Sequence, residues 1–144
     1  MKATAYVSPA LLGKRKDPVA HEVLNEDPPS LWRDELTQHC VRGMPKLQEL
    51  ALLHRASRTL ILTDLAFHIR HSASWFTPLF MRINGAYGHF GPSRIFRTLV
   101  KDRAALRASL AHLRDWDFDR IIVTHGEVLE QGGQAAMQAQ YVWV

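Results

Sequence analysis

Two short apolar stretches decide the fold, and each of them ends in a polar residue. Residues 59–64 read TLILTD and residues 120–125 read RIIVTH, so that the first ends in Asp64 and the second in His125. A β-branched, apolar run between polar residues predicts a buried strand. In α/β proteins, ligands bind where the carboxyl ends of the sheet strands open into loops. We therefore expect Asp64 and His125 at the ligand-binding edge of a sheet.

A third apolar stretch is predicted to pair with the first. Residues 48–54 (QELALLH) are separated from residues 59–64 by the polar tetrapeptide RASR. A four-residue polar gap between two apolar runs is typical of an antiparallel strand pair. A helix over residues 46–54 is the alternative, because Lys, Leu, Gln and Glu all favour helix. The strand pair is the preferred interpretation.

The clearest helix is predicted over residues 102–113. Leu106, Leu110 and Leu113 fall on one face at helical spacing, and Asp102 is a suitable N-cap. A further helix is expected after Ser93, which is a suitable N-cap. Helices are also expected over residues 30–36, 75–83 and 134–144, and the one over residues 75–83 is expected to be buried. A strand is expected over residues 2–8, followed by a surface excursion over residues 11–29. Strands and helices in this order predict an α/β layer structure.

Composition places the chain among ordinary globular domains. Its 144 residues are 47% hydrophobic and 22% charged, which fits a single domain over residues 1–144. The single cysteine, Cys40, excludes an internal disulfide and fits a reducing, cytoplasmic location. No segment has the roughly 18 uninterrupted apolar residues of a membrane span, so no membrane partner is expected. The net charge is +4, but the basic residues are scattered and nucleic-acid binding is not expected.

The two strand-end residues are suited to binding a metal ion. A carboxylate and an imidazole are ligands of zinc, iron or manganese, so Asp64 and His125 are candidate metal ligands. Gly126 allows the backbone to turn sharply beside the imidazole, and Glu127 is a candidate to orient His125 by a hydrogen bond. The alternative interpretation is that each strand ends in a polar residue because the chain reaches water there.

The same stretches carry a resemblance to a known family. Residues 49–67 (ELALLHRASRTLILTDLAF) together with residues 116–127 (WDFDRIIVTHGE) resemble the uncharacterised family called domain of unknown function 4336. That family belongs to the metallo-β-lactamase-like superfamily. The resemblance extends over most of the chain, since residues 41–45 and 132–143 are also consistent with it.

The resemblance implies an αββα sandwich with metal ions at one edge. This chain is expected to be a partial form of that sandwich, lacking the amino-terminal β-layer. Asp64 matches the superfamily aspartate that bridges two metals, and His125 matches the later histidine ligand. His54 matches a family histidine and is a third candidate ligand.

One departure from the superfamily pattern bears directly on activity. The His-rich HxHxDH motif, which supplies most of the metal ligands, is absent, and His68 and His71 come too late in the chain to match it. A metal-bound water is activated on a metal that usually has three protein ligands and an open position. Two functions are therefore predicted: a metal-dependent hydrolase acting on a small molecule, or a non-catalytic domain that homo-oligomerises or binds a protein partner through an exposed sheet face.

Overall fold

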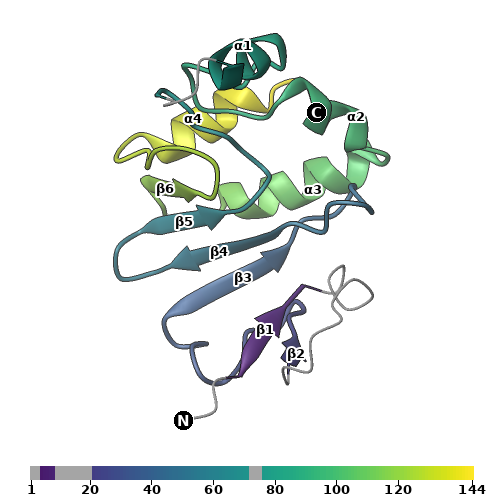
Figure 1. Ribbon diagram of the computed structural model, residues 1–144. Coiled ribbons are helices and arrows are strands. Elements are labelled where there is room, and N and C mark those ends of the chain that lie inside the picture. The colour runs from purple at the N-terminus through teal and green to yellow at the C-terminus, as the bar shows by residue number, and fades with distance from the viewer. Residues whose placement is uncertain (1–3, 9–20, 72–75) are drawn as a thin grey trace.

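The strands form a small sheet and a larger one. The computed structural model describes residues 4–8, 21–71 and 76–144. In the small sheet β1 (Ala5–Val7) pairs in parallel with β2 (His21–Val23). The larger sheet has the order β3, β4, β5, β6 (Figure 1). These four strands are Leu36–Cys40, Leu50–His54, Thr59–Leu62 and Arg120–Val123.

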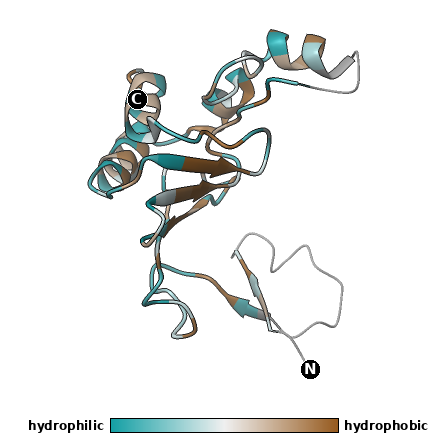
Figure 2. Ribbon diagram, turned by 90° about the vertical axis from the view of Figure 1, so that its left-hand side faces the viewer, coloured by the Kyte–Doolittle hydropathy of each residue, from teal (hydrophilic) through white to brown (hydrophobic). Residues whose placement is uncertain are grey.

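Helices from the second half of the chain accompany the larger sheet. They are α1 (Phe76–Ile83), α2 (Arg94–Leu99), α3 (Arg103–Arg114) and α4 (Gly133–Gln140). Helices α3 and α4 lie on one side of the larger sheet, while β1 and β2 lie beyond β3 (Figures 1 and 2). The predicted α/β class is confirmed. Among the described residues, no helix is both long enough and apolar enough to cross a membrane.

The predicted antiparallel pair is confirmed, and the helix alternative for residues 46–54 is wrong. In the pairing of β4 with β5, Leu52 lies opposite Ile61 and His54 lies opposite Thr59. Strand β6 then joins β5 in parallel, with Leu62 opposite Val123. All three crossover helices, α1 to α3, lie between β5 and β6 in the chain. The carboxyl ends of β5 and β6 consequently meet at the same edge of the sheet.

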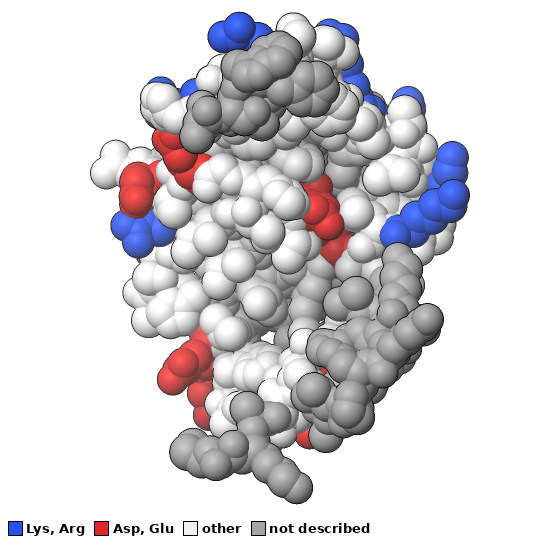
Figure 3. Space-filling model, viewed as in Figure 1, with Lys and Arg blue, Asp and Glu red and all other residues white. Residues whose placement is uncertain are grey.

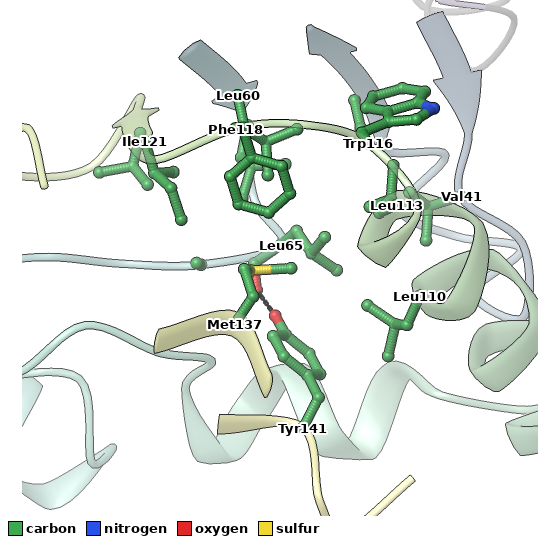
Figure 4. Packing of buried hydrophobic residues seen from close by; sticks show 14 of the residues in the cluster. Val41, Leu60, Leu65, Leu110, Leu113, Trp116, Phe118, Ile121, Met137 and Tyr141 are labelled. Carbon is green, nitrogen blue, oxygen red and sulfur yellow. Dashed lines mark hydrogen bonds between the residues drawn. The ribbon is translucent and has the colours of Figure 1, made fainter. Parts of the chain in front are cut away.

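Helix α3 supplies much of the core. Its N-cap is Asp102, whose side chain accepts a hydrogen bond from the Ala105 amide at 2.9 Å, as predicted. The face formed by Leu106, Leu110 and Leu113 is at most 3% exposed. Figure 4 shows Leu110 and Leu113 among the aromatic and aliphatic side chains of the sheet and of the chain's last segment. The apolar stripe of the capped helix therefore packs against one face of the sheet.

The two faces of the sheet differ in how well they are covered. On the face toward α3 and α4, Leu60, Leu62 and Ile121 are 0% exposed. On the opposite face, which we call the open face, Leu52 pairs with Ile61 and Ile61 with Ile122 in one row across three strands. Leu52 and Ile61 are half-buried, and Ile122 is 38% exposed. Figure 3 views this side of the molecule and shows a broad area without charged side chains to the left of the acidic residues at its centre.

Three expectations from the sequence are corrected. Strand β6 was expected to be buried, but it is an edge strand and Ile122 faces the uncovered side. Residues 30–35 form hydrogen-bonded turns rather than a helix, because the chain enters β3 at Leu36. Helix α1 forms within the predicted stretch 75–83, but Leu79 and Ile83 are 52% and 61% exposed rather than buried. Trp75 and residues 2, 3 and 9–20 lie outside the described residues.

The difference between the two faces predicts different costs for truncating their side chains. Leu60→Ala removes a fully buried side chain and should lower the free energy of unfolding by about 2–5 kcal/mol. Ile122→Ala, on the open face, should lower it by less than about 1 kcal/mol. Urea denaturation of the two variants measures both values. Equal losses would show that the open face is as well packed as the core.

Candidate metal site

Asp64 and His125 contact each other at the edge where β5 and β6 end. The His125 Nε2 atom lies 3.1 Å from Asp64 Oδ1, and the two side chains are 46% and 44% exposed. Each residue stands two positions beyond the paired residues Leu62 and Val123. Because parallel strands stay in register, the pairing places the two side chains side by side. The predicted meeting of Asp64 and His125 at one edge is confirmed.

The imidazole of His125 is positioned by an aromatic ring. Phe67 stacks on it with ring centroids 5.2 Å apart and planes inclined by 13°. Phe67 is itself fixed by two backbone hydrogen bonds of 2.9 Å with Gly91. This contact restricts the rotation of the His125 ring. Sequence reasoning missed Phe67, since a phenylalanine five residues after a strand gives no signal of its own.

A buried carboxylate holds the backbone beneath Asp64. Glu49 is 2% exposed and accepts hydrogen bonds from the backbone amides of Thr63 and Asp64, both at 2.7 Å, and from the Thr63 hydroxyl. Burial raises the pKa of Glu49, the three hydrogen bonds oppose that shift, and the neighbouring charge of Asp64 adds to it. Glu49 therefore fixes the turn on which the Asp64 side chain stands.

A second anchor lies one residue further along. The Tyr141 hydroxyl donates a hydrogen bond to the Leu65 carbonyl, as Figure 4 shows. Tyr141 follows α4, so the carboxyl-terminal helix is attached directly to the loop that carries Asp64. Burial raises the pKa of the Tyr141 hydroxyl well above its ordinary value, and the phenol therefore stays a hydrogen-bond donor.

The loops after β5 and β6 run alongside each other in close contact. The His68 amide donates to the His125 carbonyl at 3.0 Å, and the Glu127 amide donates to the His68 carbonyl at 2.8 Å. Gly126 lies between them with φ +129°, and a Cβ atom there would stand 2.2 Å from the His68 carbonyl oxygen. The predicted sharp turn at Gly126 is confirmed. The approach of the neighbouring loop explains why this position requires glycine.

Glu127 has a different partner from the one predicted, and two histidines hydrogen-bond to it. Glu127 does not orient His125, because its Oε1 atom lies 2.7 Å from Nδ1 of His71. That hydrogen bond lowers the pKa of Glu127. His68 is buried, and its Nδ1 atom lies 2.9 Å from the Glu127 carbonyl oxygen. Both histidines thus contribute to the structure of the two loops.

His54 lies at the opposite end of the sheet from the candidate site. It pairs with Thr59, and Asp64 follows five residues later, which is roughly 15 Å at the usual rise of a strand. Its Nδ1 atom lies 2.6 Å from the Ser57 hydroxyl in the turn between β4 and β5. The prediction that His54 joins Asp64 and His125 around one metal ion is therefore wrong within a single chain.

The edge offers two candidate metal ligands and two adjoining hollows. Among the described residues, no group of three or more His, Cys, Asp or Glu side chains is arranged to hold a metal ion. Asp64 lines a hollow of about 560 Å³ that extends past Leu52 to Tyr6 of β1. It also lines a smaller hollow of about 190 Å³ beside Ile95 and Leu99 of α2. A small molecule can therefore reach the Asp64 carboxylate from two sides.

Comparison with known proteins gives no family for this chain, since neither a family model nor a curated protein matches its sequence. The geometry of the edge and its sequence motifs are therefore the features that bear on function.

The buried position of Glu49 predicts a pH-dependent stability. A carboxyl group whose pKa is raised by folding holds its proton more tightly in the folded chain, so stability falls as pH rises from the unfolded pKa through the folded one. Glu49→Gln removes this dependence, and it leaves one amide donor of residues 63–64 facing an NH₂ group. We expect a loss of about 1–3 kcal/mol at pH 5. Urea denaturation from pH 4 to pH 8 measures both effects, and parallel pH curves for the two proteins would contradict the role of Glu49.

Proposed function

We propose that the chain has a metallo-β-lactamase-like fold and is a metal-dependent hydrolase in which Asp64 and His125 are two of the metal ligands. The contact of 3.1 Å between His125 Nε2 and Asp64 Oδ1 carries this proposal. Two atoms that bind one tetrahedral metal at about 2.0–2.1 Å stand about 3.3 Å apart, so the donor atoms are already at the spacing of a shared ion. The resemblance of residues 49–67 and 116–127 to that superfamily supports the same assignment.

The surrounding residues suit this role. A carboxylate and an imidazole can bind zinc, iron or manganese, and such an ion lowers the pKa of a bound water so that hydroxide forms near neutral pH. Phe67 holds the ring plane of His125, and Glu49 holds the backbone of Asp64, so both ligands are positioned before the ion arrives. The hollows beside Asp64 would receive a small-molecule substrate.

Metal binding tests the proposal directly. Titration of the chain with Zn²⁺ or Mn²⁺ in a calorimeter should show saturable binding, and Asp64→Ala with His125→Ala should weaken it by more than about tenfold. His54→Ala is the matched control, because it removes an imidazole at the far end of the same sheet. Absence of saturable binding, or equal loss in the control, would contradict a metal site at Asp64 and His125.

A second candidate function is self-association through the open face. The row formed by Leu52, Ile61 and Ile122 is apolar and incompletely covered. Two sheets pack face to face about 10 Å apart in β-sandwiches, and each then buries such a row. We propose that a second copy of the chain covers this face, which would complete a two-layered arrangement of sheets.

This association predicts a concentration-dependent mass. Analytical ultracentrifugation should show a dimer, and Ile122→Lys should convert it to a monomer because two lysines would be buried without partners. Val142→Lys is the matched control, since Val142 is 80% exposed away from the sheet. A monomer at every concentration of the unchanged chain would exclude this function and leave the metal proposal intact.

A further inference from the structure

Acidic residues are unevenly distributed along the chain. Residues 65–114 contain eight of the eighteen lysines and arginines but, in Asp102, one of the fourteen aspartates and glutamates. Asp102 is occupied as the N-cap of α3. Within the described residues, the arginines that form ion pairs are Arg42, Arg58 and Arg120, all outside this segment. The segment that contains α1, α2 and α3 therefore carries an excess of positive charge.

Apolar side chains are exposed within the same segment. Leu79 and Ile83 of α1 are 52% and 61% exposed, and Ile95 of α2 is 50% exposed. Because Leu79 and Ile83 are four residues apart, they lie on one face of the helix. Figure 2 shows α1, which follows the upper grey trace, projecting from the body of the molecule. An apolar face on a projecting helix is more than the scattered exposure found on ordinary protein surfaces.

Arg94, at the start of α2, is hydrogen-bonded to the end of α1. Its amide donates to the Asn84 carbonyl at 2.7 Å, and its guanidinium donates to the Ile83 carbonyl at 3.1 Å. Arg82 lies three residues after Leu79 and is exposed on the same face of α1, with its guanidinium 5.0 Å from the centroid of the Tyr87 ring. Arg97 of α2 instead lies over the Trp143 ring at 4.9 Å. Figure 3 shows Lys and Arg side chains around the end of the molecule that carries α1 and α2, and acidic side chains at the centre and at the left of the view. We call the surface formed by Leu79, Arg82, Ile83 and Arg94 the α1–α2 surface.

We propose that the α1–α2 surface binds the face of an anionic phospholipid bilayer. Apolar residues inserting at the level of the headgroups and arginines contacting the lipid phosphates are the two attractions that hold interfacial helices. A nucleic acid would use the cations but would leave Leu79 and Ile83 without an apolar partner. Binding of this kind needs no membrane-spanning helix, and none is found in the part of the chain that the structure describes. The proposal is independent of the metal site.

Co-sedimentation with vesicles tests the proposal on the whole chain. Vesicles of phosphatidylcholine with about 30% phosphatidylserine should bind at least about tenfold more protein than vesicles of phosphatidylcholine alone. Raising the salt from about 0.1 M to about 1 M shortens the screening length from about 10 Å to about 3 Å and should release the protein. Equal binding to both kinds of vesicle, or none to either, would overturn the proposal.

Substitutions separate lipid binding from general attraction to polyanions. Leu79→Ser with Ile83→Ser should reduce vesicle binding at least about tenfold, and the exposure of both side chains means that the melting temperature should change little. Leu31→Ser is the matched control, because Leu31 is 76% exposed but lies outside the basic segment, and it should bind as the unchanged chain does. The lipid proposal is wrong if the double variant still binds the vesicles as the unchanged chain does. If it also binds a single-stranded oligonucleotide as well as the unchanged chain does, the surface is a nucleic-acid site.

Discussion

The parallel pairing of β5 with β6 is the constraint on which the rest of the structure depends. It places Leu62 opposite Val123, and it thereby fixes where both strands end. Asp64 and His125 meet because each stands two residues beyond that pair. The helices α1 to α3 belong to the connection that this pairing requires, since parallel neighbours cannot be joined by a tight turn. The meeting of Asp64 with His125 and the position of helices α1 to α3 in the chain are thus both consequences of one strand pairing.

Around that edge, the buried polar side chains hydrogen-bond to the backbone and not to the side chains of the candidate ligands. Glu49 binds the amides of residues 63 and 64, and Tyr141 binds the carbonyl of Leu65. Burying a carboxylate is costly unless its oxygen atoms accept hydrogen bonds, and Glu49 has three donors. Asp64 and His125 can therefore stay half-exposed and available to a ligand while the loops that carry them are held firmly.

The sequence predicted those features that have local signals. The antiparallel pair β4–β5 follows from two apolar runs around a short polar turn, and α3 follows from leucine spacing and from the cap at Asp102. The meeting of Asp64 and His125 followed from their equivalent positions at two strand ends. Glu49 and Phe67 were missed, because their roles arise from contacts between segments that no spacing within the sequence reveals. His54 was misplaced for a different reason. The resemblance put it among the ligands, whereas the predicted antiparallel turn carries it to the far end of the sheet.

The long separation between the two candidate ligands has a consequence for how the chain folds. Asp64 and His125 are 61 residues apart in sequence, whereas β4 and β5 are neighbours joined by a short turn. Closing the longer loop loses more chain entropy, so the β4–β5 hairpin can form early while β6 must wait for the helices between. Partly folded chains would then hold Asp64 and His125 far apart. The paired site is therefore a late product of folding, and its presence reports that β6 has reached its final place beside β5.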